Sequence, residues 1–460
     1  MDAAGTSTAQ ARDGIAERLC RMVRIRTVSA HVEATGPGPF HEFEALLHEL
    51  YPLVHARLEV EKVTDFGILF HWPARGDAAT ASAPAVLMAH YDVVPVGDEH
   101  AWTHPPFSGE LVGEGAETAV WGRGTLDDKG AACVLLDAAE NLLAQGFAPA
   151  RDVYLWLGGN EETYGDAAKA AVALFRERGI RPWIVLDEGG AIVDEPLTGV
   201  RLDAAMVGVA EKGVLTLRMT ARSDPGHASA PPRLSATDRI ARAVGRLRAH
   251  PFPARMPPVA QDMFRVFARG ASGPLRMAMR IMASAPWLGA RMLSAMGGEP
   301  AAVVRTTVAV TMLDGGTAAN VLPESASAVL NLRIAPGETA ATAARRVRRI
   351  VRDAGVRVDV VEQHDPSPVS PVDGEQFALI AAAVGDAYDG IPSVPYIQLS
   401  ATDGRHFHAL CPATYRLAPL RMTAAQRASI HGVDEHVTVD ALVRGERFYR
   451  ALMESLPSGS

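Results

Sequence analysis

Short apolar runs that stop at or beside acidic and histidine residues alternate with helical patterns along the first 190 residues. The runs are rich in valine, leucine and aromatic residues, which favour strands. Strands that alternate with helices predict an α/β sheet with helices on both faces, and ligands of such sheets lie beyond the carboxyl ends of the strands. We expect strands at 63–72, 83–92, 151–159 and 182–190, and helices at 13–26, 40–57, 129–145 and 166–178.

The middle of the chain has a different order of elements. Its β-α-β-β-α-β pattern is the ferredoxin-like one. We therefore expect a catalytic domain formed by 1–211 and 364–460, interrupted by an inserted lid or dimerisation domain at 212–363. The inserted pattern consists of strands at 213–221, 303–313, 326–335 and 356–363, and helices at 237–249 and 338–353.

An insertion rich in methionine and proline, at 251–300, lies inside this second domain. One interpretation is helical packing on the lid or a dimer contact. The other is an apolar substrate surface, because methionine-rich faces adapt to varied apolar groups. Such a surface would fit a hydrophobic N-acyl group or an apolar peptide side chain.

Charge and cysteine content exclude several functions. The 460 residues carry a formal net charge of -8 without a dominant basic block, so we expect no nucleic-acid partner. No run of about 20 apolar residues exists, which argues against membrane insertion. The three cysteines are widely spaced and form no CxxC motif, which excludes a disulfide framework and a thiolate zinc site. The N-terminus lacks the basic and apolar regions of a signal peptide, so we predict a cytoplasmic protein.

Acidic residues and histidines gather at the predicted strand ends. Each pair alone is typical of a solvated turn, but carboxylates collected at one edge of a sheet repel one another and need a counter-charge. Arg123 and Lys129 look too few to supply it, so we expect divalent cations. Ligation by oxygen and imidazole without thiolate suits zinc, cobalt or manganese. The gathered residues are His90, Asp92, Asp127, Asp128, Glu161, Glu162, Asp187 and Glu188, with His431 near the C-terminus.

Two of these pairs have a spacing that suggests distinct roles. Residues i and i+2 of a strand point the same way, so the Asp92 carboxylate can fix the orientation of a metal-binding His90. Of the adjacent Glu161 and Glu162, one can ligate a metal while the other takes a proton from the attacking water. A dinucleotide site at the Gly-x-Gly of "WGRGTLDDKG" is disfavoured, because two aspartates stand where pyrophosphate would bind.

The same residues lie in motifs that follow one another as "HYDVVPV", "WTHPPFSGEL", "VWGRGTLDDKGA", "GGNEETYG", "LDEGG", "EKG", "GHASAPP" and "IHGVDE". This series resembles the co-catalytic zinc peptidases, which include carboxypeptidase S, aminoacylase, glutamate carboxypeptidase and succinyl-diaminopimelate desuccinylase. "WTHPPFSGEL" and "SATDGRHF" look most like the carboxypeptidase S branch, which also holds hydrolases and synthases of N-fatty-acyl amino acids. The resemblance implies a phosphorylase/hydrolase-like catalytic domain with a mixed, mostly parallel sheet, and an inserted ferredoxin-like α+β domain.

The resemblance also implies a ligand set for two divalent ions, with zinc first and cobalt or manganese as alternatives. His90 and Asp187 would bind one ion, Glu162 and His431 the other, and Asp127 would bridge them. Glu161 would be the general base and Asp92 would orient His90. In this family the peptide bond after the bridging aspartate is usually cis, which here is the Asp127–Asp128 bond.

Further residues are implied from the inserted domain and from a late loop. His227 in "GHAS" would help to stabilise the oxyanion, and in many relatives this histidine comes from the partner subunit of a dimer. Asn320 and Arg333 match positions that touch the substrate carboxylate. Thr402 and Arg405 lie in "SATDGRHF", which matches a substrate loop. For both arginines a structural salt bridge is the alternative interpretation.

These inferences together predict a two-metal hydrolase that cleaves the amide bond of a dipeptide, a C-terminal peptide or an N-acyl amino acid. An acylase or synthase acting on hydrophobic acyl groups is the alternative within enzymes, since the reverse reaction uses the same site. A non-catalytic binding protein on the same fold would lack the base or a metal ligand. A scaffold protein that assembles through the inserted domain would hold no metal, and a chelator would leave its properties unchanged. A homodimer through the inserted domain is possible.

Overall fold

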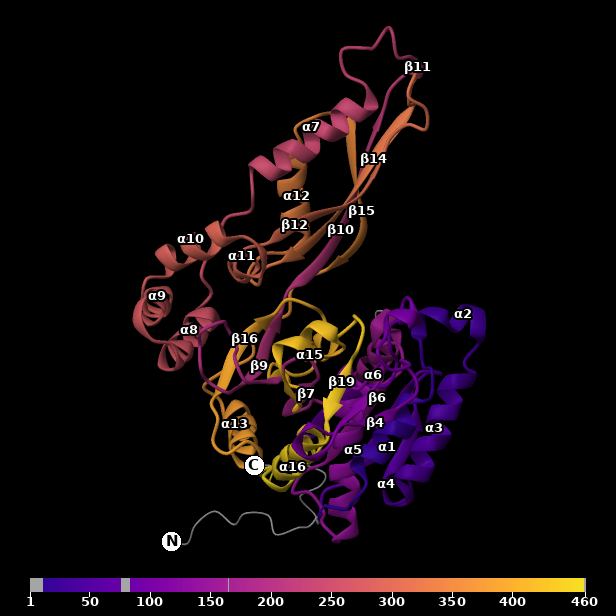
Figure 1. Cartoon of the computed structure of the whole chain (residues 1–460), viewed down its shortest axis with the longest axis vertical. Coiled ribbons are helices and arrows are strands. Elements are labelled where there is room, and N and C mark those ends of the chain that lie inside the picture. The colour runs from indigo at the N-terminus through magenta and orange to yellow at the C-terminus, as the bar shows by residue number, and fades with distance from the viewer. Residues whose placement is uncertain (1–10, 76–82, 164, 459–460) are drawn as a thin grey trace.

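The computed structural model describes residues 11–75, 83–163 and 165–458 (Figure 1). The first ten residues, part of the segment expected to lack a signal peptide, lie outside this range. A ten-stranded sheet forms the larger part, with the order β1-β2-β6-β3-β7-β17-β9-β8-β18 and with β16 paired to β9. Its strands are β1 (Glu59–Lys62), β2 (Gly67–Trp72), β3 (Ala85–His90), β6 (Val153–Gly158), β7 (Ile184–Asp187), β8 (Ile192–Val193), β9 (Ala204–Glu211), β16 (Ser393–Gln398), β17 (Thr414–Arg416) and β18 (Arg421–Met422).

The centre of this sheet is parallel and its flanks are mixed. β3 runs parallel to both β6 and β7, so the carboxyl ends of these three strands meet at one edge. β2 pairs antiparallel with β6 and with β1, and β17 antiparallel with β9. The expected mixed sheet is confirmed. The run expected as one strand at 63–72 is only partly a strand. Residues 63–66 form a turn, and β2 begins at Gly67.

Helices cover both faces of the sheet, since every residue of β3 and β6 is buried. The pattern expected as one helix at 40–57 forms two helices, because Pro52 begins a new one. A three-stranded sheet, β19-β5-β4, flanks this domain and consists of β4 (Glu110–Val112), β5 (Ala119–Trp121) and β19 (His436–Thr438). The helices are α1 (Ile15–Val23), α2 (Val32–Thr35), α3 (Gly38–Leu50), α4 (Pro52–Arg57), α5 (Lys129–Ala144), α6 (Asp166–Glu177), α13 (Glu375–Ala387), α14 (Gly404–Phe407), α15 (Ala424–Ser429) and α16 (Val439–Glu454).

The ferredoxin-like pattern is confirmed in the upper part of Figure 1. Its four strands are antiparallel in the order β12-β14-β10-β15, and two helices pack on them around a separate apolar core. A short ribbon of two strands, β11 (Gly226–His227) and β13 (Val321–Leu322), stands at the far tip. The elements are β10 (Gly213–Arg222), α7 (Ala236–Ala249), β12 (Thr307–Asp314), β14 (Ser325–Ile334), α12 (Ala340–Val351) and β15 (Val356–His364).

The segment at 251–300 folds into helices that pack against the catalytic sheet. Its buried Phe264, Phe267 and Met282 share an apolar core with residues of the larger sheet. Val200 lies just before β9, and Val394 lies in β16. The expectation of packing on the lid therefore needs correction, because the apolar faces cover the edge of the larger sheet. The helices are α8 (Pro258–Gly270), α9 (Gly273–Ser284), α10 (Pro286–Met296) and α11 (Gly298–Val304). Among the described helices, none is long and apolar enough to cross a bilayer.

Candidate metal centre

Four segments that lie far apart in the sequence bring acids and histidines together at the carboxyl edge of β3 and β6. His90 ends β3, Glu162 lies in the turn after β6, Asp127 lies in the loop that leads into α5, and His431 follows α15. Potential ligand atoms of His90, Asp127 and Glu162 all lie within 4.8 Å of one another.

Asp127 stands between the two histidines. One carboxylate oxygen lies 3.0 Å from His90 Nε2, and the other lies 2.9 Å from His431 Nε2. The same His431 nitrogen is 3.1 Å from Glu162 Oε1. A carboxylate whose two oxygens face different imidazoles has the arrangement that a bridging ligand between two ions requires.

Asp92 connects His90 to the turn that carries the glutamates. Its Oδ1 lies 3.3 Å from His90 Nδ1, and its two oxygens accept the backbone N–H groups of Glu161 and Glu162, each at 3.1 Å. Asp92 is fully buried. The side chain therefore fixes the ring of His90 and the position of the turn at the same time.

A second buried carboxylate supports the Asp127 loop. Glu435 Oε1 accepts the N–H of Leu126 at 2.7 Å and that of Asp127 at 3.1 Å. The other Glu435 oxygen pairs with Arg123 at 2.5 Å. The peptide bond between Asp127 and Asp128 is cis, as the family resemblance implied.

The nearby basic residues do not neutralise this cluster. Arg123 is engaged by Glu435, and Lys129 Nζ donates to the carbonyls of Met22 and Ile25 at 3.1 and 2.6 Å. Burial lowers the pKa of Lys129 to about 7. The charge deficit expected from the sequence therefore persists in the folded chain.

Burial and mutual repulsion raise the pKa values of the two glutamates, whereas hydrogen bonds to His431 and His90 outweigh burial at Asp127 and hold its pKa below the usual value. Burial raises the pKa of Glu161 well above its usual value, and the charges of Asp403 and Glu162 add to this increase. Hydrogen bonds to Asp127 and Glu162 raise the pKa of His431 to about 10. A raised pKa means that the ionised carboxylate is unfavourable in this environment. Cations that bind beside these carboxylates would favour the ionised form and stabilise the site.

Asp187 and Glu188 end β7 with different surroundings. Asp187 Oδ2 accepts the N–H of Gly404 at 2.5 Å, so one oxygen of this carboxylate is hydrogen-bonded to the backbone. Glu188 instead lines a cavity together with Asp127. Burial, followed by the charges of Asp127 and Asp187, raises the pKa of Glu188 well above its usual value. The sequence pairs both acids in "LDEGG", and spacing alone does not distinguish them.

This cavity has a volume of about 530 Å³ and an apolar wall. Two charged residues that we did not predict, Glu299 of α11 and Arg427 of α15, also line it. Arg427 lies on α15, four residues before His431, and His431 follows the end of that helix at Ser429. The apolar lining comes from Leu126, Ala191, Tyr396, Leu399, Ala418, Met422 and Ile430.

His227 and Asn320 lie away from this cluster. Both belong to the ribbon region at the tip of the inserted domain, where the N–H of Ala228 donates to the Asn320 carbonyl at 3.0 Å. His227 is exposed, and its Nδ1 lies 2.7 Å from Ser229 Oγ. The structure thus brings these two residues near each other and separates them from the acids.

The three residues predicted to bind the substrate, Arg333, Thr402 and Arg405, all lie outside the cavity that contains Glu188. Arg333 lies at the end of β14, opposite Val214 and Thr307 in the strand register. Thr402 is buried, and its N–H and hydroxyl donate to Glu211 at 3.1 and 2.6 Å.

Arg405 lines a separate cavity beside His364 and His408. Its Nε donates to His406 Nε2 at 3.2 Å. None of these three residues lines the cavity that contains Glu188.

The donor set fits divalent cations of the zinc type. Two imidazoles and several carboxylates converge, all three cysteines lie among the buried residues, and none of the cysteines belongs to the cluster. This chemistry suits zinc, cobalt or manganese.

Comparison with known proteins agrees with this geometry. Residues 86–455 match the model of peptidase family M20/M25/M40. N-fatty-acyl-amino acid synthase/hydrolase PM20D1.1 of Danio rerio is 33% identical over 453 residues, which cover 96% of this chain and 86% of that protein. Carboxypeptidase S of Saccharomyces cerevisiae is 26% identical over 483 residues, covering 93% of this chain and 81% of that protein.

Solved structures share the fold. An M20 family metallo-carboxypeptidase from Sulfolobus solfataricus matches with a TM-score of 0.71 at 16% identity, covering 96% of this chain and 99% of that chain. Human carnosine dipeptidase 1 matches with a TM-score of 0.66 at 13% identity, covering 95% of each chain.

Proposed function

Because this chain belongs to peptidase family M20/M25/M40, a family of metallohydrolases, we propose that its acidic cluster hydrolyses the amide bond of a dipeptide, a C-terminal peptide or an N-acyl amino acid. The observation that carries this proposal is the position of Asp127 between His90 and His431. Two ions held there would place their charge at one end of the apolar cavity, where a scissile carbonyl can lie beside Glu161.

Zinc is the proposed metal, and His90, Asp127, Glu162 and His431 are four of its proposed ligands. The family resemblance implies Asp187 as the fifth ligand; we propose Glu188 instead, because Glu188 lines the cavity whereas Asp187 accepts the backbone N–H of Gly404. When bound, the ions polarise the substrate carbonyl and make water a stronger acid.

Glu161 is the proposed proton carrier. Asp92 accepts the backbone N–H groups of Glu161 and Glu162, each at 3.1 Å, and so fixes the turn that carries both glutamates. The Glu161 carboxylate takes a proton from the attacking water and later gives it to the leaving nitrogen. A raised pKa suits this second step, because the carboxyl group then holds the proton until the amine leaves.

Arg427 and the apolar wall define the substrate that we propose. The guanidinium offers a partner for the free carboxylate of an N-acyl amino acid, and the apolar residues offer a surface for its acyl group. The relatives named as N-fatty-acyl-amino acid synthase/hydrolases support a hydrophobic acyl group. Synthesis in the reverse direction would use the same residues.

A second copy of the chain would supply what one copy lacks. His227 and Asn320 meet the acids only through closure of the inserted domain or from the partner of a homodimer. The edge strand β12 supports a dimer, because Met312 and Leu313 are 54% and 63% exposed there. The cytoplasmic location and the roles of Arg333, Thr402 and Arg405 stay predictions.

The test is a hydrolysis screen of dipeptides and N-acyl amino acids of increasing chain length, with zinc, cobalt or manganese added. Glu161→Gln should retain both metals and lose about 10²- to 10⁴-fold in kcat, as expected for a general base. Equal activity in this variant would contradict the proposal.

The fifth ligand is tested by metal content. Glu188→Gln should lower the number of tightly bound ions from two to one, whereas Asp187→Asn should retain both ions, by elemental analysis after dialysis. The reverse result would assign the position to Asp187.

A further inference from the structure

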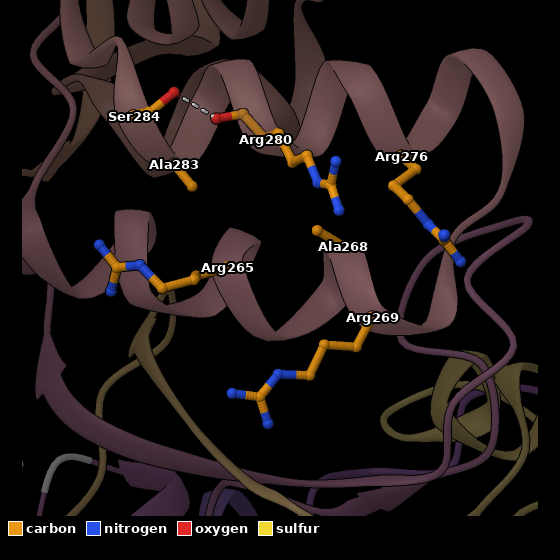
Figure 2. Close-up of a pocket in the computed structure, with 7 residues that line it drawn as sticks. All are labelled: Arg265, Ala268, Arg269, Arg276, Arg280, Ala283 and Ser284. Carbon is orange, nitrogen blue, oxygen red and sulfur yellow. Dashed lines mark hydrogen bonds between the residues drawn. The ribbon is translucent and has the colours of Figure 1, made fainter.

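The hairpin formed by α8 and α9 carries a cluster of arginines outside the catalytic cavity. Arg265 and Arg269 lie one turn apart on α8, and Arg276 and Arg280 lie one turn apart on α9. Figure 2 shows the four side chains extending from these two facing helices. They line a cavity of about 590 Å³ that shares no residue with the catalytic cavity.

The floor of this cavity is made of small residues. Ala268 of α8 and Ala283 of α9 point into the space between the helices from positions that are offset along them (Figure 2). Both are nearly buried, so the two helices are in close contact beneath the arginines. Because the side chains on the floor are methyl groups, the space between the guanidinium groups stays open to a ligand.

Few acids offset these charges. Arg265 pairs with Asp262, and the Nε of Arg276 donates to the Ala271 carbonyl at 2.7 Å. Among the residues that the structure describes, no carboxylate forms an ion pair with Arg269, Arg276 or Arg280. Like charges around one cavity repel one another, and an anion bound between them would offset this repulsion.

The charge of the whole segment differs from that of the rest of the chain. Residues 251–300 contain six arginines, no lysine and two acids, which gives a net charge of +4 in a protein of net charge -8. Arginine rather than lysine at every basic position favours planar, bidentate contacts with phosphate oxygens.

We propose that the cavity between α8 and α9 binds a ligand that bears phosphate groups. Its volume falls within the range of small-molecule sites, roughly 300–1,000 Å³. Arginines on two opposed helices suit a ligand with phosphate groups on both sides, such as a pyrophosphate. Anionic phospholipid headgroups present the same chemistry, and the experiment separates the two sources.

The experiment compares two double variants of the zinc-loaded protein. Arg269→Gln with Arg280→Gln removes one guanidinium from each helix. The matched control, Arg345→Gln with Arg349→Gln, removes the same charge from an exposed face of α12, where the two arginines are also one turn apart. Pyrophosphate is titrated by calorimetry at two salt concentrations, and vesicles of phosphatidylglycerol or phosphatidylcholine are tested by co-sedimentation.

We expect the unmodified protein to bind pyrophosphate or phosphatidylglycerol vesicles, but not phosphatidylcholine vesicles. The first double variant should bind about a hundredfold more weakly, since two charge-assisted hydrogen bonds are lost. The control should change by less than about threefold. Pyrophosphate binding identifies a soluble phosphate ligand, and binding only to phosphatidylglycerol identifies a lipid source.

Two results would overturn the proposal. One is the absence of binding to either probe by the unmodified protein. The other is an equal loss in both double variants, which would indicate nonspecific attraction. Zinc content measured after titration shows that pyrophosphate has not removed the catalytic ions, and thermal unfolding shows that both variants fold.

Discussion

The mouth of the catalytic sheet and the tip of the inserted domain each contribute a histidine to the proposed reaction, in opposite settings. His90 is buried, and carboxylates lie within 3.3 Å of both of its ring nitrogens. His227 is exposed, and its Nδ1 hydrogen-bonds to the neighbouring Ser229. One site is organised before a ligand arrives, whereas in the proposed reaction the other would act only when a substrate, a closed domain or a partner subunit meets it. The difference predicts how variants of each region behave.

Among the variants that compare the two regions here, the largest effect is expected at the tip. His227→Ala should lower kcat by about 10²- to 10³-fold, the usual cost of removing one oxyanion donor. Metal content and thermal stability should not change, because this side chain is exposed and far from the ligands. Steady-state kinetics with elemental analysis checks both statements.

A mixing experiment decides where His227 acts. If a partner subunit supplies it, refolding His227→Ala together with Glu161→Gln should restore up to about a quarter of the activity, because mixed dimers contain one intact site. No recovery in a proven heterodimer would mean that closure within one chain brings His227 to the substrate.

At the sheet mouth, Asp92→Asn should weaken metal binding by about 10- to 100-fold, as for other groups that orient a ligating histidine. The asparagine keeps the size of the side chain but loses the negative charge beside His90. Competition with a fluorescent zinc chelator measures this affinity. An unchanged affinity would show that the ring of His90 is fixed without Asp92.

Metal removal should separate the two regions in stability. Ions that bind only the folded state at about 100 times their Kd stabilise it by about 2.7 kcal/mol, so chelation should lower the Tm of the catalytic domain by several degrees. Hydrogen exchange in β10 and β14 should remain as it was, since they belong to a separate core. Equal destabilisation of both regions would show that they unfold together.

The smallest effect is expected for Ser229→Ala. Its hydroxyl contacts His227 in a solvent-exposed position, where water replaces the lost hydrogen bond. We expect kcat/KM to change by less than about threefold. A loss as large as that of His227→Ala would mean that the tip is also organised in advance.

Some of these features follow from the sequence and others do not. The alternation of strands with helices predicted the α/β sheet, and the family resemblance implied its mixed, mostly parallel order. The motifs predicted the family, which the comparison confirms. Asp127 departs from the expected strand end, since it lies in a loop six residues after β5.

Other features depend on tertiary contacts that no local pattern records. The apolar faces of 251–300 indicated buried helices, but periodicity does not tell which surface a helix covers. Adjacent acids such as Asp187 and Glu188 are equivalent until the backbone N–H of Gly404 engages one of them. No local sequence pattern distinguishes Arg427 from other helical arginines, because its place beside the cavity depends on tertiary contacts.

The chain leaves the catalytic sheet at Glu211 and returns beside it, where the N–H of Ser367 donates to the Glu211 carbonyl at 3.2 Å. Residues 212–366 therefore form an insertion whose two ends lie side by side at the catalytic sheet. The entropy of closing a loop grows only with the logarithm of its length. Changes in the length of this insertion therefore cost little free energy of folding in the catalytic domain, although they would change how far the tip of the inserted domain extends.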